Sequence, residues 1–271
     1  MAATSSPRTG TMAVGIIGAG NISDTYLENL NSFPDIEVLI VGDLLPERAR
    51  AQAEKHGVPA FGTAEDVLAH PDVELIVNLT LPASHVAVSS AALAAGKHVW
   101  SEKPIGIDRE SASALLAHAD AAGLRVGIAP DTVLGPGIQS AKRAIDRGDI
   151  GTPLFAQTGM QYAGPESFHP NPGFLFAHGA GPLFDMGPYY FTTLVSVLGP
   201  VAAVAALGMK AREEREILVG ALAGSTFPVE VPSTISVLAA FERGATSQSL
   251  LSFDSPLTRH GVVEISGTEG T

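Results

Sequence analysis

The 271-residue sequence contains no cysteine. This absence excludes disulfide bonds, thiolate zinc ligands and cysteine nucleophiles, and it is consistent with a reducing cytoplasm. No apolar run approaches the roughly 18 residues that a membrane-spanning helix needs. Residues 1–12 also lack the apolar segment of a secretory signal, so we expect them to form a flexible tail on a cytoplasmic protein.

Positive charge is scarce as well. The chain has 16 Lys and Arg against 28 Asp and Glu, which gives a formal net charge of −12. Nucleic acids and anionic membranes are bound by clustered positive charge, and the sequence has no basic run. We therefore expect neither of them as a partner.

Apolar residues make up 45% of the chain, and charged residues make up 16%. This apolar content is enough for a large core and excludes global disorder. In the first half, short apolar runs alternate with amphipathic segments. Strands are predicted at residues 13–17, 37–41, 75–79, 98–100 and 125–128, and helices at 21–30, 46–56, 84–95 and 108–122. Thr63 and Asp66 predict a further, capped helix start. Strands that alternate with helices form a parallel sheet covered on both faces.

From about Gly148 the sequence pattern changes, because helix signals become fewer. Loops rich in glycine and proline precede a strand-rich stretch at 201–265. Within it, segments 234–241 and 247–253 flank the turn residues 242–245, which predicts a hairpin. We expect residues 131–271 to form an α+β domain with a mostly antiparallel open sheet, used for substrate binding and oligomerisation. A sheet that ends so close to the last residue has a bare edge, so we expect this domain to be truncated at its C-terminus.

The segment 18–23, Gly-Ala-Gly-Asn-Ile-Ser, lies between the first predicted strand and the first predicted helix. Gly18 permits a tight turn, and Gly20 lets the backbone approach a pyrophosphate, because no Cβ is in the way. The following helix directs N–H groups and the positive end of its dipole at the phosphates. Ser23 replaces the third glycine of this motif and is small enough for close packing. Residues 13–130 are therefore predicted to be a dinucleotide-binding Rossmann domain.

An acid about 20 residues beyond the glycines accepts hydrogen bonds from the adenosine ribose in this type of domain. Asp43, at the end of the second predicted strand, matches that position. Its charge would repel a 2′-phosphate, and Leu44 and Leu45 supply no arginine to bind one. The sequence therefore predicts NAD rather than NADP as the cofactor. The alternative is that Asp43 caps the helix that follows.

Lys103 follows the fourth predicted strand, at the sheet edge where ligands bind in open α/β folds. Pro104 restricts the backbone that precedes it. Because a positively charged nicotinamide favours the neutral amine, Lys103 could exchange the hydroxyl proton of a substrate during hydride transfer. The alternative is a solvated surface lysine, which is the usual state of this residue type.

Asp185 and Tyr189 are four residues apart near the start of a predicted helix, so they share one helix face. A carboxylate and a phenol on one face suit the binding and deprotonation of a polyol. The alternative is an acid in the first turns of a helix beside a core tyrosine, because pairs at this spacing are common.

Several motifs together resemble the glucose–fructose oxidoreductase / inositol dehydrogenase (Gfo/Idh/MocA) family. They are Gly-Ala-Gly-Asn-Ile at 18–22, Asn-Leu-Thr at 78–80 with Pro82 and His85, Gly-Lys-His-Val at 96–99, Glu-Lys-Pro at 102–104, and the segment from Gly181 to Tyr189. The resemblance runs from about residue 13 to residue 271. It implies a Rossmann domain followed by an α/β domain with an open sheet, NAD(P)-dependent oxidation or reduction of sugars, inositols or related polyols, and a homodimer or homotetramer.

The resemblance also implies roles for single residues. Lys103 would be catalytic, Asp185 would contact the reacting hydroxyl region, and the Lys103–Pro104 peptide bond is expected to be cis. Thr80, Pro82 and His85 would match the loop beside the nicotinamide ribose. The predicted catalytic residues are Lys103, Asp185 and Tyr189, and the predicted cofactor-binding residues are Gly18, Gly20, Asn21, Ile22, Asp43, Thr80, Pro82, His85, Glu102 and Lys103.

One departure concerns Tyr189, because many relatives carry histidine there, while the glucose–fructose oxidoreductase branch resembles the tyrosine version. A phenol, with an ordinary pKa of ~10, is a weaker base than imidazole at neutral pH. Proton transfer is therefore expected to fall to Lys103, with Tyr189 orienting the substrate.

Two other functions stay open at this point. The chain could be a non-catalytic NAD(P)-binding sensor or assembly subunit, or a sugar transhydrogenase that keeps its cofactor tightly bound. His169 and His178 precede Asp185 and could reach a substrate. We expect no metal site, because no His-x-x-x-His or Glu-rich cluster is present.

Overall fold

The computed structural model describes residues 10–271. The chain divides into two compact units, the first ending at Ala129 and the second spanning Pro130–Thr271. The predicted tail, residues 1–12, falls mostly on positions 1–9, which lie outside the described residues. In the described part of the chain, no helix is both long enough and apolar enough to cross a membrane.

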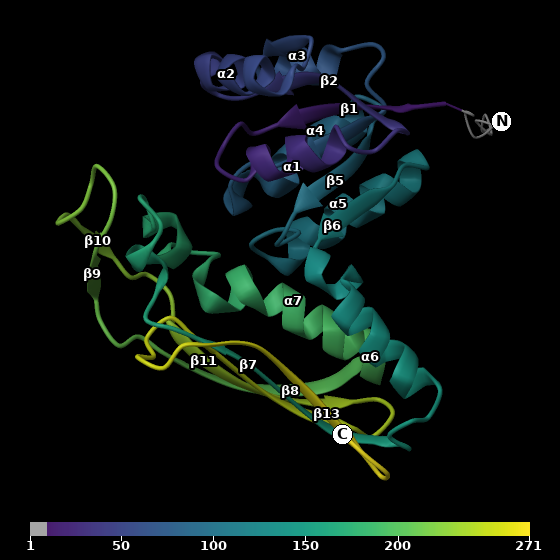
Figure 1. Cartoon of the computed structure of the whole chain (residues 1–271), viewed down its shortest axis with the longest axis vertical. Coiled ribbons are helices and arrows are strands. Elements are labelled where there is room, and N and C mark those ends of the chain that lie inside the picture. Colours follow the sequence, from purple (N-terminus) through teal and green to yellow (C-terminus); the bar gives the residue numbers. More distant parts are fainter. Residues whose placement is uncertain (1–9) are drawn as a thin grey trace. The chain divides into compact units, whose positions relative to one another are not determined.

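The first unit is built on a six-stranded, all-parallel sheet in the order β3-β2-β1-β4-β5-β6. Its strands are β1 (Met12–Ile17), β2 (Ile36–Gly42), β3 (Ala60–Gly62), β4 (Leu75–Asn78), β5 (His98–Glu102) and β6 (Val126–Ala129). Its helices are α1 (Ser23–Leu30), α2 (Pro46–His56), α3 (Ala64–Ala69), the 3-10 helix η1 (Pro82–Ser84), α4 (His85–Ala94) and α5 (Arg109–Ala122). Figure 1 shows strands and helices alternating along this unit, as the sequence pattern predicts.

Local chemistry sets the helix ends. Thr63 and Asp66 form a reciprocal capping box at the start of α3, so this predicted helix start is confirmed. The side chain of Asp108 accepts a hydrogen bond from the Ser111 amide and caps α5. Helix α5 then ends at Gly123 in the left-handed conformation, which glycine adopts at little cost. Every strand and helix predicted for the first half is present, with ends shifted by at most two residues.

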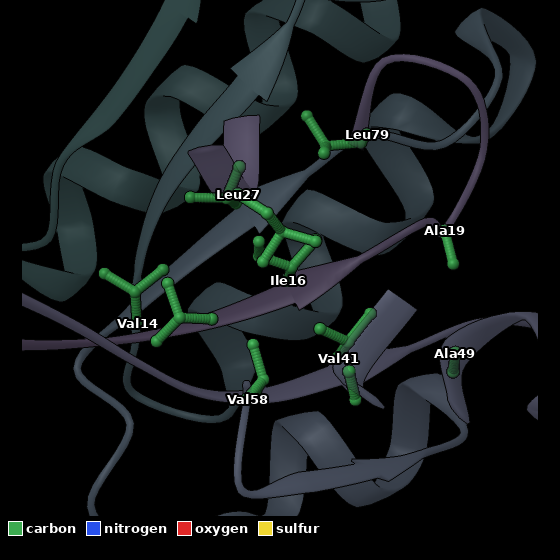
Figure 2. Close-up of a cluster of buried hydrophobic side chains, with 11 residues drawn as sticks. Val14, Ile16, Ala19, Leu27, Val41, Ala49, Val58 and Leu79 are labelled. Atoms are coloured by element: carbon green, nitrogen blue, oxygen red, sulfur yellow. The ribbon is translucent and has the colours of Figure 1, made fainter. Parts of the chain in front are cut away.

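The core of the first unit is centred on β1. Val14 and Ile16 are fully buried and pack with Leu27 of α1 and Val41 of β2 (Figure 2). Ile17 belongs to a second apolar cluster, so β1 is buried on both of its faces. Each such side chain contributes roughly 1.5–3 kcal/mol on burial, and this packing fixes the end of β1 from which the glycine loop departs.

The second unit carries a five-stranded mixed sheet in the order β13-β7-β12-β11-β8. Its strands are β7 (Pro153–Gln161), β8 (Val201–Met209), β11 (Thr234–Phe241), β12 (Thr246–Ser252) and β13 (Arg259–Gly267), and β9 (Glu214–Glu216) with β10 (Thr226–Pro228) forms a separate two-stranded sheet. Its helices are η2 (Asp131–Leu134), α6 (Pro136–Asp146), η3 (Pro165–Ser167), η4 (Gly173–Phe176) and α7 (Gly181–Leu198). Of the four pairs of neighbouring strands in this sheet, only β7 and β12 pair in parallel, so the sheet is mostly antiparallel, as predicted.

The predicted hairpin is confirmed, because β11 and β12 pair in antiparallel register across the turn. The helix predicted to open near Gly181 is also confirmed as α7, which lies along one face of the sheet (Figure 1). The opposite face is open: Phe155 of β7 and Leu238 of β11 are exposed, whereas their neighbours Ala156 and Val237 are buried. Every residue of the edge strand β8 is exposed.

Candidate active site

The strand order of the first unit reverses between β1 and β4, because the chain builds β1, β2 and β3 to one side and β4, β5 and β6 to the other. Ligands of open parallel sheets bind at such a switch point, outside the carboxyl ends of the strands. Three segments leave the sheet at this edge: residues 18–22 after β1, residues 79–84 after β4, and Lys103 directly after β5. Most of the predicted cofactor-binding residues belong to the ends of these three strands or to the loops after them. The exceptions are Asp43, which follows β2, and His85, the first residue of α4.

The two glycines of the loop after β1 are constrained differently. Gly18 has a φ of 109°, and a Cβ there would lie 2.7 Å from the carbonyl carbon and oxygen of Leu79. Only glycine fits this turn, whose amide donates to the Gly42 carbonyl at 2.8 Å. A Cβ on Gly20 would meet no protein atom within 4 Å and would project into open space. Protein packing therefore does not require glycine at this position, whereas close approach of a ligand to the backbone would.

Helix α1 begins directly behind this loop. Ser23 is fully buried, and its hydroxyl donates to the Gly20 carbonyl at 2.6 Å, so the small residue in place of a third glycine packs as expected. In the described structure, no side chain caps the start of α1 at Ile22. The N-terminus of α1 therefore presents backbone amides and a positive dipole end, which suits an anion such as a pyrophosphate. Asn21 and Ile22 are exposed at this point.

Asp43 connects the end of β2 to the glycine loop. One carboxylate oxygen accepts the Ala19 amide at 2.7 Å, and the other accepts the Leu45 amide at 2.9 Å. Leu45, not Asp43, is the N-cap residue of α2, so the alternative that Asp43 caps this helix is wrong. A carboxylate offers about four acceptor positions, and these two bonds use two of them. The half-buried Asp43 can thus shape the loop and still accept hydrogen bonds from ribose hydroxyls.

Lys103 stands in a well-defined turn at the end of β5. The Lys103–Pro104 peptide bond is cis, as expected. The carboxylate of Glu102 accepts the Tyr26 hydroxyl at 2.7 Å and the Lys103 amide at 3.1 Å. Glu102 therefore joins α1 to the turn that carries the half-buried Lys103. Tyr26 is a residue that the sequence analysis missed, because a tyrosine on an amphipathic helix is indistinguishable there from an ordinary core residue.

The loop after β4 is organised by Asn78, which is fully buried. Its carbonyl oxygen accepts from the Thr80 amide at 3.2 Å and from the Thr80 hydroxyl at 2.7 Å. Its amide nitrogen donates to the His85 carbonyl and to the Ser89 hydroxyl, each at 3.1 Å. A polar residue that closes a buried strand is the signal that marks Asn78 as an organiser of this loop. Pro82, at the start of η1, is half-buried.

The second unit contains a pocket of about 550 Å³ beside the start of α7. Asp185 lines it, together with the aromatic side chains of Tyr162, Phe168 and His260. The ring centroids of Tyr162 and Phe168 are 6.1 Å apart in a stacked arrangement, and those of Tyr162 and His260 are 5.2 Å apart. Its remaining lining residues are Ala163, Ser167, Met186 and Thr258, so the lining contains no Lys or Arg. Tyr189 is half-buried against the apolar core of the unit and is not among the lining residues.

Tyr162 remains a neutral phenol in this pocket. Burial raises its pKa well above the usual range, and the negative charges of Asp185 and Glu166 act in the same direction. Its hydroxyl can therefore donate or accept a hydrogen bond, whereas its ring presents an apolar face to the pocket. The pocket thus combines one carboxylate with aromatic surfaces.

A buried ion network lies beneath the pocket wall. The guanidinium of Arg215, on β9, binds Glu166 at 2.6 Å and Asp254 at 2.9 Å. It also donates to the carbonyl of Ala163, a pocket residue, and to the carbonyl of Phe253. Arg215 therefore fastens the loop of the pocket wall to the end of the sheet. Residues 212–216 form a charge run, for which the sequence predicts a solvated surface, and for Arg215 this prediction is wrong, because its side chain is only 3% exposed.

The two histidines that precede Asp185 have local roles. The Nδ1 atom of His169 accepts the Asn171 amide at 3.0 Å, and burial lowers the pKa of His169. The backbone amide of His178 donates to Glu230 at 3.0 Å. Neither histidine is among the lining residues of the pocket. Among residues 10–271, no group of three or more His, Asp or Glu side chains could hold a metal ion.

The strand order, the glycine loop and the acid at the end of β2 define the first unit as a Rossmann dinucleotide-binding domain. The chain belongs to the Gfo/Idh/MocA family. Residues 12–129 match the model described as "Oxidoreductase family, NAD-binding Rossmann fold", and residues 138–271 match the "GFO/IDH/MocA C-terminal domain".

Relatives with curated names include the trans-1,2-dihydrobenzene-1,2-diol dehydrogenase of Sus scrofa, which is 28% identical over 94% of this chain and 72% of its own length. The inositol 2-dehydrogenase of Burkholderia vietnamiensis is 31% identical over 53% of this chain and 44% of its own length. The chain thus matches less than half the length of this inositol dehydrogenase and of the uncharacterized oxidoreductase YrbE of Bacillus subtilis.

Solved structures share the fold at lower identity. An NAD binding oxidoreductase from Klebsiella pneumoniae superposes with a TM-score of 0.84 at 23% identity, over 96% of this chain and 71% of that one. The WlbA dehydrogenase of Bordetella pertussis, solved with NADH and UDP-GlcNAcA, gives a TM-score of 0.81 at 20% identity, over 96% of this chain and 72% of that one. These likenesses establish the two-unit fold.

Proposed function

We propose that this protein is an NAD-dependent oxidoreductase that interconverts a secondary alcohol and a ketone in a sugar, an inositol or a related polyol. The observation that carries the proposal is the combination, at one sheet edge, of a dinucleotide cradle and a lysine held in a fixed turn. Dehydrogenases among the relatives, including inositol and dihydrodiol dehydrogenases, support the reaction class. Bound NAD would accept or return a hydride.

The residues of the first unit fit this cofactor. The open space over Gly20 and the uncapped start of α1 would take the pyrophosphate, and Asp43 would accept the ribose hydroxyls. The negative charge of Asp43 would oppose a 2′-phosphate, and exposed Leu44 follows it instead of an arginine. We therefore propose NAD as the preferred cofactor. A higher kcat/KM with NADP than with NAD would refute this preference.

Lys103 is proposed to hold and move the proton of the substrate hydroxyl. Its amide is fixed by Glu102 and its backbone by the turn at Pro104, so the side chain starts from a defined place at the sheet edge. A neutral amine can take a proton from a hydroxyl as the carbonyl forms, and return it in the reverse direction.

The pocket of the second unit is proposed to bind the substrate. A cyclic polyol has apolar C–H faces that suit the rings of Tyr162 and Phe168, and hydroxyls that suit Asp185. Because the lining contains this carboxylate and no Lys or Arg, we expect neutral polyols to bind better than carboxylated or phosphorylated sugars. Tyr189 is proposed to support the substrate site from one helical turn beyond Asp185.

We also propose that the chain forms a homodimer or homotetramer, through the open face of the sheet in the second unit. Exposed apolar side chains, among them Phe155, Leu238 and Leu207, occupy this face and its edge. A self-complementary apolar face is the usual basis of a twofold dimer. The cytoplasmic location stays a prediction.

A panel of substrates tests the proposed function. Purified protein is incubated with NAD and with neutral polyols, including myo-inositol and glucose, and with glucuronate and glucose 6-phosphate as charged counterparts. We expect NADH to form with at least one neutral polyol and less with its charged counterpart. NAD binding without NADH formation across the whole panel would instead favour a non-catalytic sensor or assembly subunit.

A further inference from the structure

His85 is the first residue of α4 and is only 1% exposed. Its two ring nitrogens both face backbone carbonyl oxygens. Nδ1 lies 2.6 Å from the oxygen of Pro104, and Nε2 lies 2.9 Å from the oxygen of Thr80. These carbonyls belong to the turn after β5 and to the loop after β4, so the imidazole bridges two of the three segments at the cofactor edge of the sheet.

The chemistry of the partners restricts the state of the ring. A carbonyl oxygen only accepts hydrogen bonds, and a neutral imidazole carries a single N–H. A neutral ring could therefore donate to one carbonyl but would direct a lone pair at the other. The buried ring therefore holds at least one of the two carbonyls by a hydrogen bond and packs against the other.

The charges around the ring are few. The segments that flank it, β4, η1 and α4, contain no Asp, Glu, Lys or Arg. The turn after β5 carries Glu102 and Lys103, and exposed Asp108 caps the neighbouring helix α5. The two backbone carbonyls are thus the direct polar partners of the ring.

We propose that His85 is a positioning residue whose buried ring ties the Thr80 loop to the Lys103–Pro104 turn. The inference rests on the proposed function, because it assigns Lys103 a fixed place for proton transfer. His85 would act through the backbone on either side of it and not by touching the substrate. The network of Asn78 supports this role, because it fixes both Thr80 and the backbone carbonyl of His85.

The direct test is NMR of the wild-type chain labelled with 15N-histidine. Two-bond correlations should show a ring N–H proton of His85 that exchanges slowly with water, because the ring is buried between two carbonyls. The assignment comes from the spectrum of His85→Gln, in which this signal is absent. A ring N–H of His85 that exchanges as fast as that of the exposed His118 would overturn the proposed bridge.

Variants test the positioning role. His85→Phe keeps a ring of similar shape but has no N–H, and His85→Gln keeps a donor. We expect His85→Phe to lower kcat on the order of tenfold, because small displacements of a reacting group are costly, and His85→Gln to recover part of the loss. His118→Gln, on the exposed face of α5, is the matched control and should behave as wild type.

A purely structural role would lower the melting temperature of His85→Phe but leave kcat per folded molecule within about twofold of wild type, and that result would overturn the inference. If His85→Phe does not fold, the NMR result on the wild type decides. If the wild type turns over no polyol, the proposed function fails. The inference is then judged on the NMR spectrum and on whether His85→Phe shifts the backbone amide signals of Thr80 and Lys103.

Discussion

Gly18 and Gly20 illustrate, at the scale of single residues, how one motif contains two different physical requirements. The φ of 109° and the close backbone of Leu79 exclude any side chain at Gly18. Nothing in the protein excludes a side chain at Gly20, where a methyl group would occupy only the space above the loop. The first glycine is therefore needed for the fold and the second for the ligand.

This difference predicts opposite effects of two methyl groups. Gly20→Ala should keep the melting temperature of the wild type and weaken NAD binding by on the order of tenfold or more, because its methyl group lies where the pyrophosphate would approach. Gly18→Ala should lower the melting temperature, because its backbone conformation and the Leu79 contact are both unfavourable. Thermal unfolding and NAD titration measure the two effects. Unchanged NAD affinity in Gly20→Ala would contradict the assignment of the cradle.

Single residues also show what sequence reasoning can reach. Gly18 and Asp43 follow from a motif whose letters encode backbone geometry, whereas the cis bond before Pro104 was expected only from the family resemblance. Lys97 does not follow in the same way: its amine donates to the carbonyls of His70 and Val73, and burial lowers its pKa. The hydrogen-bond partners of Lys97 are backbone carbonyls that the fold brings together, so no side-chain pattern in the sequence predicts these bonds.

Among elements, α1 and α2 are joined by ion pairs on Asp24. Hydrogen bonds from Lys55 and then from His56 lower the pKa of Asp24 to about 2. A carboxylate with a lowered pKa in the folded state stabilises the fold above its ordinary pKa of 3.8, and this contribution is lost as the pH falls through about 2.

Asp24→Asn should therefore reduce stability at pH 5 and remove part of the loss of stability between about pH 4 and pH 2. Urea midpoints of wild type and variant across this range measure the effect. Asp146→Asn, which removes an exposed pair with Lys142 within α6, is the control for a general change of charge. Parallel pH curves for wild type and Asp24→Asn would show that the inter-helix pairs do not contribute.

The buried network of Arg215 connects β9, the η3 loop and the end of β12. Arg215→Met should lower the free energy of unfolding by about 3–5 kcal/mol, because Glu166 and Asp254 would remain buried without their partner. It should also raise the KM for the polyol, because the network holds the Ala163 side of the pocket. Urea unfolding and steady-state kinetics measure the two effects.

Arg50→Met is a matched control, because Arg50 forms an exposed pair with Glu54 within α2 that is worth at most about 0.5 kcal/mol. Equal stability of the Arg215 and Arg50 variants would contradict the description of the network as a support of the pocket.

The strands and helices differ in how clearly their sequences predict them. The strands and helices predicted for the first unit carry strong apolar runs or end signals such as Gly57 and Gly123, and their ends agree with the structure to within two residues. The three-residue strand β3 is not among them. Helix α6 was not predicted, and none of its residues is fully buried. Strand β7 was not predicted either, because Phe155 faces outward where the pattern expects a buried aromatic, and Gly159 interrupts it. Strand β7 exposes the large apolar side chains of Leu154 and Phe155 and buries the small side chains of Ala156 and Thr158, which reverses the usual pattern of a strand.

At the scale of the whole molecule, the open sheet face of the second unit predicts self-association. Leu238 lies on this face, and its side chain is exposed. Leu238→Glu should shift the protein toward a monomer in light scattering after gel filtration, because burying a carboxylate in an apolar interface is costly. Leu116→Glu, on an exposed position of α5, should leave the oligomeric state unchanged. A wild-type protein that is monomeric at all concentrations would refute the proposed homo-oligomer.

The account rests on Lys103 as the group that handles the substrate proton. The most direct measurement is the kcat of Lys103→Ala at saturating NAD and polyol, together with its NAD dissociation constant. We predict that kcat falls by about 10²-fold or more while NAD binds nearly as in the wild type, and that Lys142→Ala, which changes a half-buried lysine of α6 paired with Asp146, retains full activity. An unchanged kcat in Lys103→Ala would contradict the account.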